Sequence, residues 1–178
     1  MVAALEAAEV PYMLTGSYAS SLHSIPRATR DIDIVIFPDR DQLTRFIHSL
    51  PPERYHADLE DAMDALKRRS QFNVIDHATG WKVDFIIPAF DEFHIEEFAR
   101  RKAVDVEGLQ LWIVSPEDIV LAKLSWAKAG ESERQIEDAA TVLRIQGSKL
   151  DVAYLESWAR KLQIEEQWRM AREKANRA

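Results

Sequence analysis

The sequence predicts an α+β (mixed α/β) protein in which a small mixed sheet flanked by helices is followed by a helical C-terminal region. Short β-branched runs bounded by proline or glycine alternate with helical patterns up to about residue 115. Beyond that point the apolar spacing is helical to the end of the chain. We therefore expect a core over residues 1–115 and a C-terminal helical region over residues 116–178 that packs on this core.

Up to residue 50 the chain is predicted to alternate between helix and strand. Each predicted strand is a short apolar or β-branched run, the first closed by a turn at Thr15–Ser17 and the second by Pro38. The last helix of this stretch opens with Asp39, a favourable N-cap. In chain order we expect a helix over 3–10, a strand over 12–14, a helix over 18–23, a strand over 31–37 and a helix over 39–50.

Between residues 59 and 114 the clearest signal is a β-hairpin. Two apolar runs flank the short loop 77–80, which ends in a glycine, and Pro88 closes the second run. Gly108 separates two later strands. In chain order we expect a helix over 59–69, strands over 72–76 and 81–87, a helix over 91–101, a short strand before Gly108 and a strand over 109–114.

The C-terminal region opens with a strong helix-start signal. Ser115 is a favourable N-cap, and Pro116 at the first helical position has the backbone angle that a helix requires. From there we expect helices to the end of the chain, interrupted near Gly130, Gly147 and Gln163.

The composition is that of a folded domain and excludes several classes of protein. At 178 residues the chain can bury a sizeable core without disulfides, and it has no cysteine. No apolar run approaches a membrane span and the N-terminus lacks the positive charge of a signal peptide, so we expect a cytoplasmic protein without membrane partners. A net charge of −7 disfavours a protein that coats nucleic acid through phosphate contacts.

Three carboxylates are predicted to lie on strands. Asp31 and Asp33 are two residues apart in a strand, so both side chains share one face and their Cα atoms lie about 6.5–7 Å apart. Asp84 alternates in the same way with Val83 and Phe85. The plain alternative is that these aspartates mark the polar face of a half-exposed strand. As a group, carboxylates among β-branched and aromatic residues are costly unless they are paired or bound to a cation.

A glycine–serine pair precedes the first two carboxylates. Gly16 and Ser17 follow a short strand and open a short helix, a place where backbone N–H groups can bind phosphate oxygens. This dipeptide is common in ordinary turns, so its value lies in the combination with the aspartates. Thirteen residues separate Ser17 from Asp31.

The order Gly16–Ser17, then Asp31–Ile32–Asp33, then a distant Asp84 resembles the DNA polymerase β-like nucleotidyltransferase superfamily. Its pattern is Gly-Ser, Asp-x-Asp and a third carboxylate on a later strand. The stretch R-A-T-R-D-I-D-I over residues 27–34 is similar more particularly to the AbiEii-type nucleotidyltransferases of toxin–antitoxin systems and the minimal nucleotidyltransferase branch. The resemblance implies a polymerase-β-like nucleotidyltransferase fold.

The resemblance also implies an activity and a catalytic site. A nucleoside monophosphate would pass from a nucleoside triphosphate to a hydroxyl acceptor, with release of pyrophosphate. Asp31, Asp33 and Asp84 would be the catalytic and metal-binding residues, holding two Mg²⁺ ions, or Mn²⁺ in their place. Gly16 and Ser17 would hold the phosphates.

Further nucleotide-binding residues follow from the same resemblance. In the AbiEii-type proteins a Glu-Asp…Lys…Asp segment follows the core, and Glu117–Asp118, Lys123 and Asp138 stand in similar relation. Lys123 lies in an apolar helical run, so it must extend to water, pair with a carboxylate or meet a phosphate. Asp138 equally forms an i,i+4 pair with Arg134. Arg27 or Arg30 would reach the triphosphate, or either would remain a solvated loop residue.

Two functional hypotheses remain at this stage. The first is an active nucleotidyltransferase whose acceptor is a tRNA, a protein hydroxyl or a small molecule, with a cognate toxin or antitoxin as a further partner. The second is a non-catalytic member that binds nucleotide or a partner protein and acts as an antitoxin or regulator. The presence of all three carboxylates favours the first hypothesis.

Overall fold

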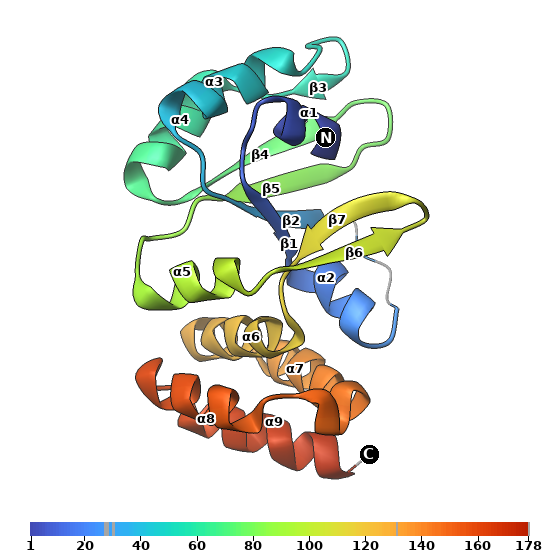
Figure 1. Ribbon diagram of the computed structural model, residues 1–178, viewed down its shortest axis with the longest axis vertical. Helices are drawn as coiled ribbons and strands as arrows, with labels where there is room; N and C mark the ends of the chain where they lie inside the picture. The colour runs from blue at the N-terminus through green and yellow to red at the C-terminus, as the bar shows by residue number, and fades with distance from the viewer. Residues whose placement is uncertain (27–28, 30, 131, 178) are drawn as a thin grey trace. The chain divides into compact units, whose positions relative to one another are not determined.

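The computed structural model describes residues 1–26, 29, 31–130 and 132–177, and confirms the mixed α/β class (Figure 1). Its described residues form a seven-stranded sheet with the order β3-β4-β5-β2-β1-β7-β6. The strands are β1 (Tyr12–Thr15), β2 (Asp31–Ile36), β3 (Tyr55–His56), β4 (Gln71–Asp76), β5 (Lys82–Ile86), β6 (Lys102–Val106) and β7 (Leu109–Ile113). The sheet is mixed, because β2 pairs with β1 in antiparallel and with β5 in parallel orientation.

The predicted helices are present, with some shifted ends. They are α1 (Val2–Ala7), α2 (Gly16–His23), α3 (Arg40–Ser49), α4 (Leu59–Arg68), α5 (Glu92–Ala99), α6 (Pro116–Gly130), α7 (Glu133–Gln146), α8 (Val152–Lys161) and α9 (Glu165–Arg177), with a 3-10 turn at Gly147–Lys149. The first helix ends earlier than expected because Glu9 has a left-handed backbone with φ +57°. The second begins at Gly16 itself, within the stretch expected to be a turn.

Strand β3 is the element that the sequence pattern does not predict. It is two residues long and pairs with the end of β4, Tyr55 opposite Asp76 and His56 opposite Ile75. A strand this short has too few residues to show an alternating pattern. Only its pairing with β4 in the structure identifies it as a strand.

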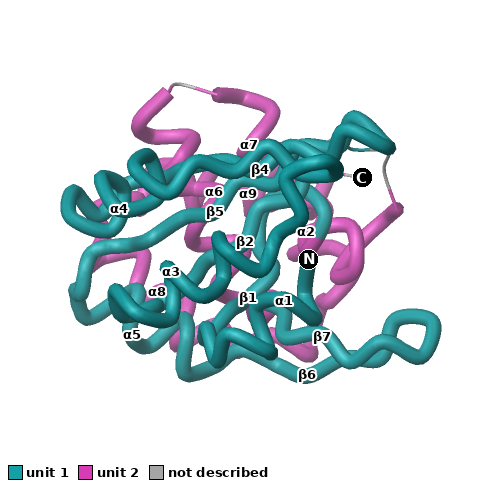
Figure 2. Tube along the Cα trace, turned by 90° about the horizontal axis from the view of Figure 1, so that it is seen from above, with its two compact units in different colours: residues 1–18, 28–113 teal, residues 19–27, 114–178 magenta. Residues whose placement is uncertain are grey.

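The protein consists of two compact units (Figure 2). The first unit contains residues 1–18 and 28–113, and the second contains residues 19–27 and 114–178. The end of α2 therefore belongs with the C-terminal helices. The boundary predicted after residue 115 stays a prediction.

The first unit has its core on one face of the sheet. Alternation along β2 directs Ile34 and Ile36 into this core, where Phe85 of β5 joins them. Helices α1, α3 and α4 contribute Leu5, Phe46 and Ala62, among other buried residues. The ring of Phe46 packs edge-on against that of Phe85, with 5.1 Å between their centroids. Polar residues of β2 and β5 consequently lie on the opposite face.

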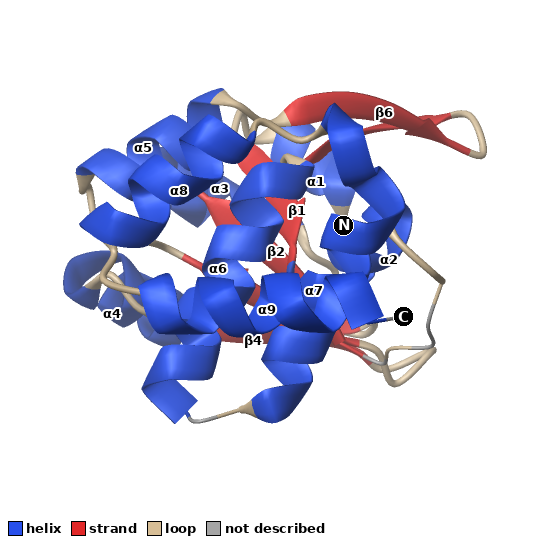
Figure 3. Cartoon of the chain, turned by 90° about the horizontal axis from the view of Figure 1, so that it is seen from below, coloured by secondary structure: helices blue, strands red, loops and turns tan. Residues whose placement is uncertain are grey.

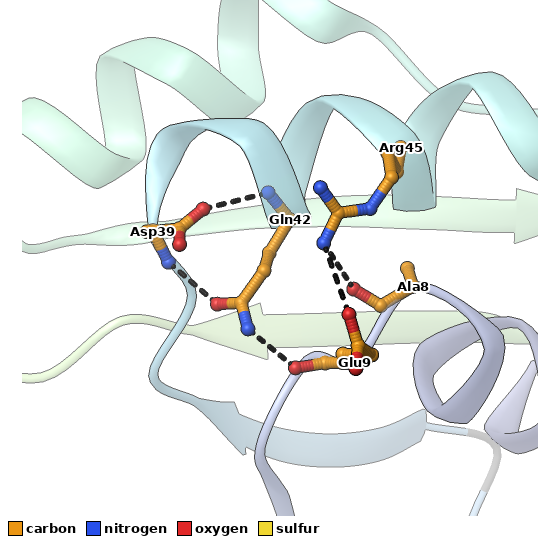
Figure 4. Close-up of polar contacts among 5 residues, drawn as sticks. All are labelled: Ala8, Glu9, Asp39, Gln42 and Arg45. Carbon is orange, nitrogen blue, oxygen red and sulfur yellow. Dashed lines mark hydrogen bonds and ion pairs between the residues drawn. The ribbon is translucent and has the colours of Figure 1, made fainter.

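The start of α3 is secured by its own cap and by the chain that follows α1 (Figure 4). Asp39 caps the helix, as predicted, and forms a reciprocal capping box with Gln42. The Gln42 side-chain amide also donates a 2.6 Å hydrogen bond to the carbonyl of Glu9, and Arg45 donates to the carbonyl of Ala8. These bonds satisfy carbonyls where α1 has ended.

The second unit is built from helices (Figure 3). Helix α6 begins as predicted, because the Ser115 hydroxyl accepts a hydrogen bond from the Asp118 N–H. The Asp118 carboxylate is fully buried and accepts 2.6 Å hydrogen bonds from the hydroxyls of Ser115 and Tyr154. A buried carboxylate with such partners ties α6 to α8. In the part of the chain that the structure describes, no helix is long and apolar enough to cross a membrane.

Candidate active site

A tight corner joins β1 to α2. Thr15, the last residue of β1, is the register partner of Asp33 on β2. Gly16 follows with φ +65°, and a Cβ at this position would lie 2.6 Å from the Asp33 Cγ and closer still to its Oδ2. Only glycine fits here, because both the backbone angle and the neighbouring carboxylate exclude a side chain. The Ser17 backbone N–H donates a hydrogen bond to the Asp33 carboxylate.

Strands β2 and β5 bring the three predicted carboxylates to one face of the sheet. The two strands are parallel, and Asp33 is the register partner of Asp84. Register partners on neighbouring strands lie about 4.8 Å apart and point to the same face. Asp31 lies two residues before Asp33 and therefore shares that face. We refer to Asp31, Asp33 and Asp84 as the acidic cluster.

The members of the acidic cluster differ in their exposure to water. The Asp31 side chain is 57% exposed, whereas that of Asp84 is only 12% exposed. Burial raises the pKa of Asp33, and the negative charges of Asp84 and Asp31 raise it further. The Ser17 N–H and the Lys82 ammonium oppose this shift in the Asp33 pKa. Burial and the two neighbouring carboxylates thus both disfavour the ionised form of Asp33.

Among the residues that the structure describes, Lys82 is a cationic side chain in contact with the acidic cluster. It lies on β5, two residues before Asp84 and opposite Asp31 in register. Its Nζ is 2.7 Å from Asp84 Oδ2 and 4.0 Å from Asp31 Oδ1. The hydrogen bond with Asp84 is the main cause that raises the pKa of Lys82. The ammonium thus bridges two of the three carboxylates.

The cluster has the chemistry of a divalent-cation site, although its side chains are not arranged as one. Carboxylate oxygens are the ligands that Mg²⁺ and Mn²⁺ prefer, and the acidic cluster places three carboxylates on one face of the sheet. Among the described residues, no group of three or more His, Cys, Asp or Glu side chains is placed so that it could hold a metal ion. In the cluster itself, Asp84 is engaged by Lys82. The donor set fits a divalent cation once that contact is released.

The other predicted nucleotide-binding residues lie elsewhere in the chain. Lys123 of α6 is buried, and its ammonium donates to Asp138 Oδ2 at 2.9 Å and to Gln135 Oε1 at 3.2 Å. Lys123 and Asp138 belong to the second unit, whereas the acidic cluster belongs to the first. Arg27 and Arg30 lie outside the described residues. The roles of Lys123, Asp138 and Arg27 in nucleotide binding stay predictions.

Two residues of the site face were missed by sequence reasoning. Lys82 and Asn73 stand in register with Asp31 and Asp84, respectively, and share the face of the acidic cluster. For Lys82 a signal was present, because a residue two positions before Asp84 in a strand must point to the same side. Asn73 could be placed only with the hairpin register, which depends on the turn.

A Gly-Ser corner against two acidic strands of a mixed sheet is the arrangement that the resemblance to polymerase-β-like nucleotidyltransferases predicts. The sequence confirms this class over nearly its whole length: the chain belongs to the family described as "Nucleotidyltransferase of unknown function (DUF6036)", whose model matches residues 3–177. The resemblance to the polymerase β-like superfamily is therefore confirmed. The AbiEii-type branch stays a prediction.

Solved structures of nucleotidyltransferases share this fold. An antigenic nucleotidyltransferase-like protein from Paracoccidioides brasiliensis is 16% identical, with a TM-score of 0.53 over 95% of this chain and 89% of that chain. The antibiotic-resistance factor ANT(2″)-Ia is 17% identical in its solution structure, with a TM-score of 0.56 over 94% of this chain and 91% of that chain. A crystal structure of ANT(2″)-Ia in complex with adenylyl-2″-tobramycin has a TM-score of 0.52, with 15% identity over 90% of this chain and 92% of that chain. No curated protein matches this chain.

Proposed function

We propose that this protein is a Mg²⁺-dependent enzyme that transfers a nucleoside monophosphate from a nucleoside triphosphate to a hydroxyl acceptor. The observation that carries the proposal is the pairing of Asp33 with Asp84 on parallel strands, beside a glycine corner that admits no side chain. The acceptor oxygen attacks the α-phosphorus, the bond to the bridging oxygen breaks, and pyrophosphate leaves.

The acidic cluster supplies the metal ligands and a proton acceptor. Asp31, Asp33 and Asp84 would hold two Mg²⁺ ions, for which Mn²⁺ can substitute. Bound divalent cations stabilise charge on the attacking and leaving oxygens of such a displacement. We propose that Asp84, the less exposed carboxylate, accepts the proton of the acceptor hydroxyl. Asp31, the more exposed carboxylate, would be a further metal ligand.

The phosphates would be held by backbone and by basic side chains. Gly16 leaves its backbone open to close approach, and the Ser17 hydroxyl at the start of α2 adds a donor. Lys123 and Arg27 are proposed to contact the nucleotide phosphates, with Asp138 orienting the Lys123 ammonium through their 2.9 Å contact. Lys123 is buried and paired with Asp138, so its ammonium would have to share or leave that carboxylate to meet a phosphate.

The acceptor is proposed to be a hydroxyl of a tRNA, of a partner protein or of a small molecule. Support for a small molecule comes from ANT(2″)-Ia, which shares the fold and whose structure holds an adenylylated tobramycin. A toxin–antitoxin role would follow from a tRNA or protein acceptor, with the cognate antitoxin or toxin as a partner. Each acceptor class predicts a different labelled product, so one assay distinguishes them.

The test is transfer of label from each of four α-labelled nucleoside triphosphates, with Mg²⁺, to total tRNA, to protein extract and to polyhydroxylated small molecules. Asp33→Asn and Asp84→Asn should each lower transfer by at least ~100-fold. Asp64→Asn, which removes an exposed carboxylate paired with Arg68 on α4, should leave it unchanged. Equal transfer by all three variants would refute the assigned site. A folded protein that transfers nothing but binds nucleotide would support the non-catalytic alternative.

A further inference from the structure

Lys82 and a divalent cation would compete for the carboxylate of Asp84. Asp84 is only 12% exposed and stands next to two like charges, so it needs a cation close by. In the protein alone that cation is Lys82, at 2.7 Å. A divalent ion bound by Asp84 Oδ2 would meet the Lys82 ammonium, which already contacts that oxygen. Two cations of this kind cannot occupy one carboxylate oxygen without strong repulsion.

We propose that Lys82 is a resident counter-ion of the acidic cluster, a positioning residue that holds Asp84 and Asp31 in the metal-free protein and that a divalent cation displaces. This inference rests on the proposed function, because it assumes that the cluster binds the metal. It adds a residue that competes with the metal and so sets its affinity. The 4.0 Å approach to Asp31 places Lys82 across two ligands at once.

The geometry allows this displacement. The Lys82 side chain is 41% exposed, and its four-carbon stem lets the ammonium move into water while the backbone of β5 stays in its ladder. Asp84 cannot follow it, because its own side chain is largely buried on the same strand. Without a cation to replace Lys82, the carboxylate would be left next to Asp33 and Asp31 uncompensated. Displacement is therefore coupled to arrival of the metal.

If Lys82 and Asp84 formed only an ordinary surface ion pair, removing the Lys82 charge would affect stability and metal affinity differently. A partly exposed pair contributes little to stability and has no effect on metal affinity beyond net charge. A competing counter-ion predicts opposite effects on two measurements: the metal-free protein loses stability when the charge is removed, and the metal binds more tightly. The two interpretations therefore separate experimentally.

The test measures Mn²⁺ binding without nucleotide, by electron paramagnetic resonance of free Mn²⁺, on the full chain. Lys82→Met removes the charge and keeps the apolar stem, and we expect it to bind Mn²⁺ at least ~5-fold more tightly than the unmodified protein. Lys67→Met on α4 removes one charge at an exposed position of the same unit and should change the affinity less than 2-fold. Lys82→Arg keeps the charge and should bind no more tightly than the unmodified protein.

The melting temperature provides the second readout. In EDTA, Lys82→Met should melt below the unmodified protein, and saturating Mn²⁺ should remove or reverse this difference. Lys82→Gln serves if the methionine variant does not fold. Unchanged or weaker Mn²⁺ binding by the charge-removing variant would overturn the inference while leaving the proposed function intact. No Mn²⁺ binding by any variant, or binding that survives Asp84→Asn, would overturn both.

Discussion

Replacing Gly16 with alanine tests the corner of the site in two separable ways. The first cost is the backbone, since φ +65° is unfavourable for alanine by about 1–2 kcal/mol. The second is the clash, because the new Cβ would lie 2.6 Å from Cγ and 2.8 Å from Cβ of Asp33. Asp33 would have to leave its position and give up the hydrogen bond from the Ser17 N–H, which costs about 1.5–3 kcal/mol. We expect a total loss of about 2.5–5 kcal/mol.

Gly80 provides a matched control for the backbone cost. It has a similar φ of +70°, but a Cβ there would meet nothing within 4 Å. Gly80→Ala should therefore cost only about 1–2 kcal/mol. The clash at Gly16 should disappear when Asp33 is itself replaced by glycine, so in that background Gly16→Ala should cost as little as Gly80→Ala.

The assay is equilibrium urea unfolding of the four proteins of the Gly16–Asp33 cycle, together with Gly80→Ala. A coupling free energy of about 1.5–2.5 kcal/mol between Gly16→Ala and Asp33→Gly would confirm the close approach. The reasoning would be refuted if Gly16→Ala cost no more than Gly80→Ala, or if its cost were the same with and without Asp33.

Three further outcomes are expected. Asp33→Asn should raise the melting temperature in EDTA above pH 7, because the pKa of Asp33 is raised in the folded protein and its ionised form destabilises the fold. The gain in melting temperature should shrink as the pH falls through that pKa. A gain that stays constant with pH would contradict this. Asp138→Ala should lower the free energy of unfolding in urea by about 3 kcal/mol, because the buried Lys123 ammonium loses this carboxylate. Lys123→Met should lower it much less. Equal losses would argue against a buried pair. Tyr154→Phe should cost about 1–2 kcal/mol in the same assay, because fully buried Asp118 loses a 2.6 Å donor, and an unchanged midpoint would show that this bond contributes nothing.

The sheet and helices were predictable where local chemistry determines them. Pro38 and Pro88 follow the ends of β2 and β5, and Asp39 caps α3 by forming the bonds that its residue type predicts. The short strand β3 was not predictable, because its pairing with β4 is a contact between distant parts of the chain. The early end of α1 depends on the left-handed backbone of Glu9, which a non-glycine residue seldom adopts.

The candidate site was predictable in its composition more than in its geometry. Period-2 alternation was enough to place Asp31 and Asp33 on one face, and the resemblance supplied Asp84 as the third member. That Asp84 pairs in register with Asp33 could not follow from sequence, because register between parallel strands is set by packing of the whole sheet. The engagement of Asp84 by Lys82 likewise appears only once side chains are placed.

The most direct measurement of the central claim is which phosphorus of the triphosphate reaches the acceptor. The protein is incubated with Mg²⁺, acceptor and either α-labelled or γ-labelled triphosphate in parallel. We expect the α-label alone to appear on the acceptor, with one pyrophosphate released for each transfer. Label from the γ-position on the acceptor, or release of inorganic phosphate without transfer, would contradict it.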